Sequence, residues 1–370
     1  MMHEYIKIDK IKNVWEVNPV TGDYSYDEDG RHYLCIDGVF LEKEDRATDL
    51  VSVGEYVYAR YGCGTLEIYS GHTVLKVFEK DYGLLDRDLD TYIEYQGYDP
   101  ETFELHENII FVSDGRRLLA QDVPYSLYEV EGMVFGYELF KTEFCRIDIS
   151  SEVLWCFPLR RIDDEGCDRG ADHLDKVLGI ANGMIWICTD WGRLIALNVE
   201  TGELMYQFIP ADVAEDKIVF MDEENSVYRL IGGVGVFFFR ETDKTLLSIS
   251  NWGILILDAA TAELIESYSF AKVDPQGIAT FEHVMNPRLQ GDYFVFMGER
   301  THEFGVCGWA GVFDLQARKL LWTDEVVPAE EREKTGNQLV VSRPIYYAGE
   351  RVYVIDAEDT LHFSYRSAPF

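Results

Sequence analysis

The chain of 370 residues carries 67 acidic and 33 basic residues, which give a formal net charge of −34 at pH 7. Such a surface repels nucleic acid and anionic membranes, because binding to either requires basic patches, so both kinds of partner are excluded. No apolar run approaches the roughly 18 residues that a membrane-spanning helix needs. Residues 1–10 lack the apolar core of a secretory signal and the seven cysteines are scattered, so we expect a cytoplasmic protein.

Tyrosine and phenylalanine are abundant, proline is scarce and the apolar runs are short, which favours an all-β protein. One pattern of two strands joined by a tight turn recurs in 14–26, 66–77, 108–122, 144–155, 183–208, 245–270 and 308–322. Such a repeat indicates an array of small antiparallel sheets, each of which buries its faces against its neighbours. No linker interrupts the array, so we expect residues 1–370 to form a single β-propeller domain.

The repeats are counted by the polar residue that closes the third strand of each unit. These residues are Asn18, Tyr69, Asp122, Asp148, Asn198, Asp258 and Asp314. Seven markers favour seven four-stranded blades. Only 26 residues separate Asp122 from Asp148, too few for a full blade, so a count of six blades stays open.

The end of the chain predicts how the ring closes. Segments 351–355 and 361–365 read as a hairpin with its turn at 356–359, and no outer strand follows them. The N-terminal strands have no inner strands before them and can therefore complete this last blade. A ring closed by strands from both termini has no exposed sheet edge.

The repeat is clearest over 183–208. Trp191-Gly192 precedes an apolar strand that ends at Asn198, and Thr201-Gly202 leads into the next strand. This pattern resembles the propeller repeat of quinoprotein dehydrogenases, whose consensus is G-x-L-x-A-L-D-x-x-T-G-x-x-x-W. For the quinone enzymes, the resemblance implies calcium-binding carboxylates, a vicinal cysteine pair and an aspartate base, none of which can be placed in this sequence. We therefore expect the fold without a quinone, a nucleotide or an essential metal.

Motifs for other chemistry are incomplete as well. Asp86-Arg87-Asp88 begins like a calcium loop, but Thr91 stands where that loop requires glycine. His302-Glu303 lacks the second histidine of a zinc protease helix. No Gly-x-Ser-x-Gly nucleophile motif occurs. The sequence therefore predicts a protein that is not an enzyme.

One face of the predicted propeller gathers carboxylates and indoles, because the loop 159–177 and the turns between second and third strands open on the same side. The residues predicted to bind a partner are Asp163, Asp164, Glu165, Asp168, Asp172, Asp190, Trp191, Trp252, Glu358 and Asp359. Carboxylates beside aromatic rings suit the capture of Arg- and Lys-rich partners through charge-assisted hydrogen bonds and cation–π contacts. The alternative is that Trp191, Trp252 and Trp309 pack between blades.

These features predict a non-enzymatic, acidic, protein-binding propeller that is monomeric and has no cofactor. This profile suits a bacterial immunity protein that binds and neutralises a basic toxin domain. Two alternatives stay open: a scaffold or assembly factor with several protein partners, and a propeller enzyme or sugar-binding protein with a pocket at the central channel. The sequence does not identify the partner.

Overall fold

The computed structural model describes residues 5–366 with internal gaps. The residues outside the description are 1–4, 19–20, 54–55, 79–81, 85–90, 99–104, 112–124, 139–140, 149, 151, 163–167, 209–219, 222–226, 229–235, 301–307, 327, 329, 331–344, 349–350, 357 and 367–370. Contacts between residues divide the chain into two compact units. Unit 1 comprises Met1–Lys80 and Ser269–Phe370, and unit 2 comprises Asp81–Tyr268.

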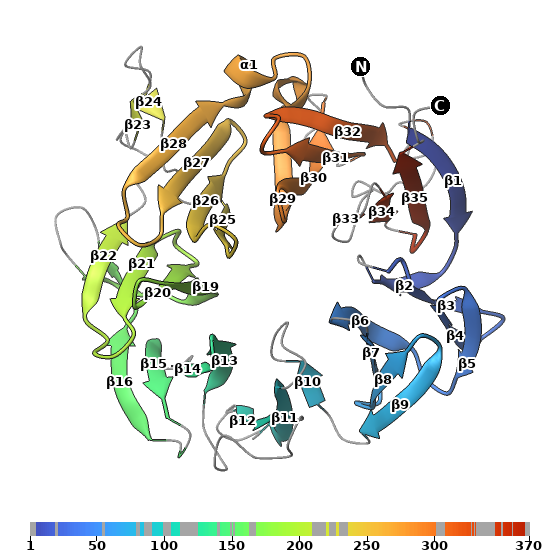
Figure 1. The fold of residues 1–370 in the computed structure, drawn as a ribbon, viewed down its shortest axis with the longest axis horizontal. Coiled ribbons are helices and arrows are strands. Elements are labelled where there is room, and N and C mark those ends of the chain that lie inside the picture. The colour runs from blue at the N-terminus through green and yellow to red at the C-terminus, as the bar shows by residue number, and fades with distance from the viewer. Residues whose placement is uncertain are drawn as a thin grey trace. The chain divides into compact units, whose positions relative to one another are not determined.

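The described part of unit 1 contains four antiparallel sheets of four strands each, labelled in Figure 1. The first two are β2 (Val14–Val17), β3 (Tyr24–Glu28), β4 (Arg31–Ile36) and β5 (Val39–Lys43), then β6 (Ala47–Val53), β7 (Tyr56–Tyr61), β8 (Leu66–Ser70) and β9 (Thr73–Phe78). The third is β29 (His283–Gln290), β30 (Tyr293–Glu299), β31 (Trp309–Asp314) and β32 (Lys319–Glu325).

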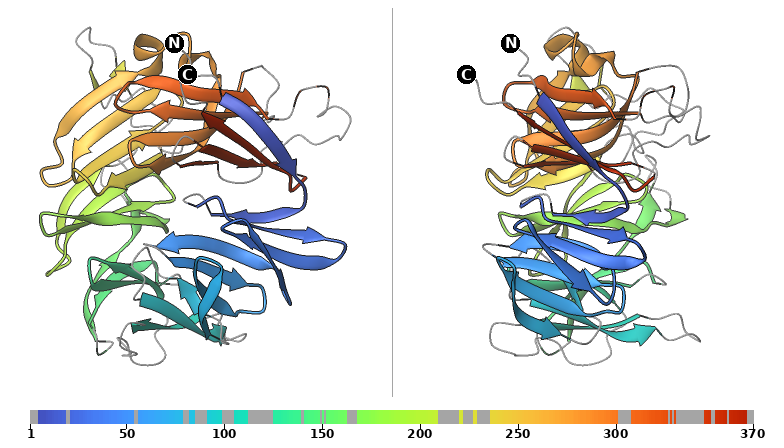
Figure 2. Two further views of the ribbon diagram at one scale, coloured as in Figure 1. Left: turned by 45° about the vertical axis from the view of Figure 1, so that its right-hand side comes forward. Right: turned by 90° about the vertical axis from the view of Figure 1, so that its right-hand side faces the viewer.

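The fourth sheet of unit 1 is built from both ends of the chain. Its strands are β33 (Tyr346–Ala348), β34 (Arg351–Ile355), β35 (Leu361–Arg366) and β1 (Tyr5–Ile11). Strand β1 is antiparallel to β35, with Tyr5 opposite Arg366 and Ile11 opposite Leu361. Figure 1 and both views of Figure 2 show β1, in blue, alongside β35, in dark red. The predicted hairpin and the predicted pairing of N-terminal with C-terminal strands are thus present in unit 1.

The described part of unit 2 contains three four-stranded sheets. They are β13 (Ser126–Val130), β14 (Met133–Glu138), β15 (Glu143–Ile147) and β16 (Val153–Pro158); β19 (Leu174–Ala181), β20 (Met184–Thr189), β21 (Leu194–Asn198) and β22 (Leu204–Phe208); and β25 (Val236–Arg240), β26 (Thr245–Ile249), β27 (Gly253–Asp258) and β28 (Leu264–Ser269). A three-stranded sheet precedes them, with β10 (Tyr82–Leu84), β11 (Thr91–Tyr98) and β12 (Leu105–Phe111). Two short hairpins are β17 (Arg160–Ile162) with β18 (Asp168–Ala171), and β23 (Phe220–Met221) with β24 (Val227–Tyr228).

The described residues therefore form seven four-stranded sheets, the number that the sequence favoured, and one additional three-stranded sheet. Four of the predicted markers close third strands as expected: Asp148, Asn198, Asp258 and Asp314 follow or end β15, β21, β27 and β31. Tyr69 lies inside the third strand β8. Asp122 lies outside the described residues.

The marker Asn18 is wrong, because it follows β2, the first strand of its sheet, and not a third strand. The turn explains the error. The amide of Asn18 donates to Asp23 O at 2.7 Å and the amide of Gly22 donates to Asn18 O at 2.8 Å. The turn between β21 and β22 has the same pair of bonds, starting from Asn198. The motif thus specifies a turn type, and it does not specify where in a sheet the turn stands.

Burial follows strand position within each sheet. Every residue of the second strand β20 is buried, whereas Leu204, Met205 and Tyr206 of the outermost strand β22 are exposed. A short run that is apolar at every position is expected for a strand covered on both faces by neighbouring sheets. One core cluster accordingly joins β13–β16 to β19–β22, and another joins β19–β22 to β25–β28.

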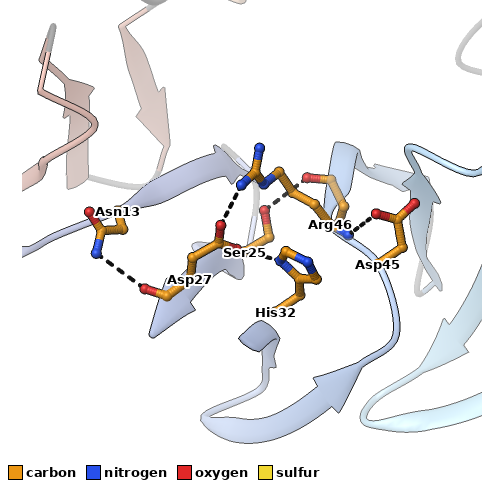
Figure 3. A network of polar contacts seen from close by, with 7 residues as sticks. Asn13, Ser25, Asp27, His32, Asp45 and Arg46 are labelled. Carbon is orange, nitrogen blue, oxygen red and sulfur yellow. Dashed lines mark hydrogen bonds and ion pairs between the residues drawn. The ribbon is translucent and has the colours of Figure 1, made fainter. Parts of the chain in front are cut away.

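A network of polar contacts links the first two sheets of unit 1 (Figure 3). Asp27 on β3 accepts a hydrogen bond from Arg46 at 2.5 Å and bonds to Nδ1 of His32, on β4, at 2.7 Å. The guanidinium of Arg46 lies 3.4 Å from the ring centroid of Trp15, on β2. Burial alone would raise the pKa of Asp27, but Arg46 and His32 hold it below its ordinary value. The network fixes the segment that enters β6.

The helical elements within the described ranges are short, namely α1 (Phe270–Val273) and η1 (Ile278–Thr280). In that part of the chain, no helix has both the length and the apolar character needed to cross a membrane.

Candidate partner-binding surface

Trp191 stands at the tip of the turn between β20 and β21. The amide of Gly192 donates to Thr189 O at 2.8 Å, and the amide of Arg193 donates to Oγ1 of Thr189 at 3.2 Å. Gly192 has a φ of +75°, a backbone conformation that glycine adopts without a steric cost. The turn projects the indole of Trp191 outward, where the residue is 41% exposed.

Trp252 occupies the equivalent turn of the next sheet, between β26 and β27. The hydroxyl oxygen of Ser250 accepts hydrogen bonds from the amides of Trp252 at 3.2 Å and Gly253 at 3.3 Å, which closes the turn. Trp252 is 63% exposed. Both residues are thus exposed, Trp252 more than Trp191.

The two turns lie at the same end of their sheets. At the opposite end, Nδ2 of Asn182, in the turn between β19 and β20, donates to Ala260 O, in the turn between β27 and β28, at 3.4 Å. The two sheets therefore run in the same orientation, which brings the turns of Trp191 and Trp252 to the same side of unit 2. The sequence predicted this relationship from the repeat.

A buried ion pair supports the turn of Trp191. Nη1 of Arg193 lies 3.5 Å from Oδ2 of Asp172, and the two side chains are 2% and 0% exposed. Arg193 also donates to Oε1 of Gln207 at 2.7 Å and to the carbonyl oxygen of Arg160. Burial lowers the pKa of Arg193, while the carboxylate of Asp172 acts in the opposite direction.

The prediction that Asp172 belongs to the binding surface is therefore wrong, because its side chain is buried. The sequence placed it with the exposed carboxylates of the polar loop, but the loop ends in the hairpin of β17 and β18 and returns Asp172 to the interior. There it balances the charge of Arg193. The neighbouring His173 accepts or donates a hydrogen bond of 2.9 Å with the hydroxyl of Tyr137, at the end of β14.

The structure describes only some of the other predicted carboxylates. Asp190 is exposed beside Trp191. Asp163, Asp164 and Glu165 lie outside the described residues, and of Asp168 only the backbone, in β18, is described. Their part in a binding surface stays a prediction.

Glu358 and Asp359 belong to unit 1, in the turn between β34 and β35, where Glu358 is exposed and Asp359 is half-buried. Their membership of a common surface with Trp191 also stays a prediction. Trp309, in the same unit, is half-buried, with its ring 6.2 Å from that of Phe281 and 4.1 Å from the guanidinium of Arg300.

Asp175 is a residue that the sequence did not single out. It is exposed near the start of β19, and its Oδ2 lies 3.5 Å from Sγ of Cys188, on β20. Leu174, its neighbour, is paired with Thr189, so Asp175 lies at the same end of the sheet as Trp191. The register of β19 shifts between Leu174 and Lys176, so the alternation of inward and outward side chains along the sequence does not predict that Asp175 faces solvent.

Among the described residues, one group combines side chains of metal-binding type: Glu143, Cys145 and Cys156. The two cysteines are joined by a disulfide. The sequence did not predict this bridge, because the two cysteines stand 11 positions apart, on separate strands, in no recognisable motif.

Comparison with known proteins gives a fold and no family. No family model matches the chain. The dehydrogenase subunit of a quinone alcohol dehydrogenase of Gluconobacter oxydans is 26% identical over 161 residues, which cover 42% of this chain and 20% of that protein. The chain thus matches only a minor part of the length of this relative.

Two solved structures are similar over 100% of both chains. The C-terminal WD40 domain of Sif2 has a TM-score of 0.57 and 11% identity, and Sqt1 of Saccharomyces cerevisiae has a TM-score of 0.52 and 10% identity. WD40 repeats build β-propellers. At such low identity the likeness concerns the fold alone, which is that of a β-propeller and agrees with the resemblance to the quinoprotein repeat.

Proposed function

We propose that this chain is a non-enzymatic protein-binding propeller. Trp191, Trp252, Asp175 and Asp190, here called the Trp191–Trp252 surface, form part of its binding site. The observation that carries the proposal is the exposure of two indoles, 41% and 63%, in equivalent turns of adjacent sheets. An indole in solvent adds little to the core, whereas tryptophan is enriched among the residues that dominate the energy of protein interfaces.

The charge of the chain indicates the kind of partner. With a net charge of −34 and exposed carboxylates beside both the Trp191 turn and β19, the surface favours cationic side chains. An arginine or lysine of the partner gains both a carboxylate and an aromatic face. Long-range attraction raises the rate of association and weakens as salt screens it. We therefore propose a basic protein as partner.

The finer proposal is that the partner is a basic toxin domain, which the chain neutralises as an immunity protein does. We also propose that the two units form one propeller domain, monomeric and cytoplasmic. The repeat, which occurs in both units, and the insertion of unit 2 within the sequence of unit 1 support a single domain. A scaffold with several partners is the alternative within the same class.

Affinity capture from the native host, followed by mass spectrometry, tests the proposal. We expect one basic protein to be captured by the parent chain and lost from the double variant Trp191→Ala, Trp252→Ala. Several unrelated partners would favour the scaffold instead. An acidic partner, or a partner retained by the double variant, would contradict the Trp191–Trp252 surface.

Surface plasmon resonance with the captured partner then tests the electrostatic part. Asp190→Lys is expected to slow association about two- to tenfold at low salt and much less at high salt. Glu263→Lys is the matched control, because Glu263 is exposed in the turn between β27 and β28, at the opposite end of its sheet. Equal effects of the two reversals would show that net charge, and not this surface, controls association.

A second candidate is a quinone-dependent enzyme, favoured by the 26% identity to the quinone alcohol dehydrogenase subunit. It requires a bound quinone. Native mass spectrometry of the protein from its own host distinguishes the two, since a stoichiometric small-molecule adduct would favour the enzyme.

A further inference from the structure

Strands β15 and β16 carry a cysteine pair in direct cross-strand register. Cys145 is opposite Cys156, with 4.1 Å between their Cα atoms, and a disulfide joins the two sulfurs. Such a short Cα separation is typical of the non-hydrogen-bonded pairs of an antiparallel ladder, in which side chains approach most closely. The bond thus links two strands that the backbone already pairs.

The two cysteines differ sharply in exposure. Cys145 is completely buried on the third strand of its sheet, whereas Cys156 is exposed on the outermost strand β16. An attacking thiol therefore reaches Cys156 and not Cys145. Of the free cysteines in the described residues, Cys35 and Cys188 are buried and Cys63 is exposed.

We propose that Cys145 and Cys156 form a reversible thiol–disulfide exchange site, entered through Cys156 and used by low-molecular-weight thiols and their disulfides. An incoming thiolate attacks Sγ of Cys156, the bond between the two protein sulfurs breaks, and Cys145 leaves as a thiolate that takes up a proton. A second small thiolate then attacks the sulfur of the first small thiol in this mixed disulfide, and Cys156 leaves as a thiolate that takes up a proton. Two electrons pass to the protein, two protein thiols form, and the two small thiols leave as one disulfide.

Glu143 is expected to control the rate of this exchange. It precedes Cys145 by two residues on β15, so both side chains point to the same face of the sheet. Its carboxylate and the two sulfurs lie within 4.8 Å of one another. A negative charge at this distance disfavours the thiolate, which is the reactive form in both directions of the exchange.

The exchange is expected to affect strand β16, which contacts the next sheet, β19–β22. Trp155, the neighbour of Cys156 on β16, donates its indole N–H to Val199 O at 2.9 Å. The disulfide ties this outermost strand to β15, and after reduction the strand keeps its backbone ladder and the packing of Trp155 and Phe157 against the next sheet. Reduction is therefore expected to increase hydrogen exchange in β16 without unfolding the chain.

The test uses the full-length folded protein in buffers of reduced and oxidised glutathione, with thiol trapping and peptide mass spectrometry. We expect Cys145 and Cys156 to gain and lose two thiols together, reversibly, with a transient glutathione adduct on Cys156. Glu143→Gln is expected to speed re-oxidation at pH 7 about three- to tenfold, and Cys63→Ser is the control that leaves the exchange unchanged.

Three outcomes would overturn the proposal. The first is a bond that is reduced only when the protein unfolds in denaturant, which would make it purely structural. The second is a pair that stays reduced in oxidised glutathione. The third is stoichiometric zinc binding by the reduced protein that blocks re-oxidation, which would identify Glu143, Cys145 and Cys156 as a metal site. The variant Cys156→Ser, measured in parallel, shows whether the adduct depends on Cys156.

Discussion

The indole Nε1 of Trp155 donates a hydrogen bond of 2.9 Å to the carbonyl oxygen of Val199, in the adjacent sheet of unit 2. Trp186 repeats the arrangement one sheet further on, with a bond of 2.8 Å to Ala259 O. In both cases the acceptor directly follows the marker residue of the repeat, Asn198 or Asp258. The marker turn therefore does more than reverse the chain, because it presents a carbonyl group to the preceding sheet.

The glycine of the Thr-Gly pair belongs to the same contact. A Cβ atom on Gly202 would lie 2.6 Å from Cδ2 of Trp155, and Gly202 has a φ of +70°. We expect Gly202→Ala to reduce the free energy of unfolding by about 3 kcal/mol, through backbone strain and the clash with the indole. Urea denaturation of the parent chain and the variant measures this difference in the free energy of unfolding.

The control for this variant is Gly183→Ala. Gly183 has a similar φ of +72°, but a Cβ there meets nothing within 4 Å. It should cost only the backbone strain, about 1 kcal/mol. Equal losses in the two variants would show that the contact with Trp155 contributes nothing.

The fold could be predicted from the sequence because each repeat is recognisable within a short stretch of residues. Asn198, Asp258 and Asp314 each combine a turn signal with flanking apolar runs, and the structure places all three at the ends of third strands. Asn18 shows the limit of such signals, because its turn has the same hydrogen bonds in a different position of the sheet. Turn chemistry determines local geometry, and strand order depends on contacts that are distant in sequence.

The candidate surface was predictable only in part, for the same reason. Trp191 and Trp252 follow from the repeat geometry. The burial of Asp172 depends on Arg193, which lies 21 positions later, in the turn between β20 and β21. The pairing of Cys145 with Cys156 depends on the register of β15 against β16. These contacts between residues distant in sequence cannot be predicted from the residues that flank each position.

Asp172 and Asp190 provide a direct test of the corrected surface. Asp172→Ala leaves the guanidinium of Arg193 buried without its counter-charge, so we expect a loss of about 3 kcal/mol in the free energy of unfolding. Asp190→Ala, at an exposed position, should change it by less than about 0.5 kcal/mol. Thermal and urea unfolding measure both. If Asp172→Ala changed the free energy of unfolding as little as Asp190→Ala, the pair of Asp172 and Arg193 would add little to stability.

The pH dependence of stability is expected to involve Asp356, in the turn between β34 and β35. Burial alone would raise its pKa, but hydrogen bonds from His362 and from the amides of Thr360 and Glu358 hold the pKa below its ordinary value. Because the pKa is lower in the folded state, the stabilisation is complete above the unfolded value, about 3.9, and is lost as the pH falls through the folded value.

The variant Asp356→Asn tests this dependence. The difference in unfolding free energy between the parent chain and the variant should stay constant above about pH 5 and shrink below about pH 4. Urea denaturation from pH 3 to pH 7 provides the measurement. A difference that is independent of pH would show that the charge of Asp356 does not stabilise the turn.

Removal of strand β1 tests the joining of the two chain ends. Removal of residues 1–12 takes β1 away from β35 and leaves the backbone groups along one side of β35 without their partners. Such an edge costs stability and also templates association between molecules. We expect the midpoint of thermal unfolding to fall by at least about 5 °C and the truncated chain to aggregate on heating. Added peptide 1–12 should restore the midpoint, whereas a peptide of the same composition in scrambled order should not. A truncated chain with the parent midpoint would show that β1 is dispensable, and rescue by the scrambled peptide would show that its register against β35 is not specific.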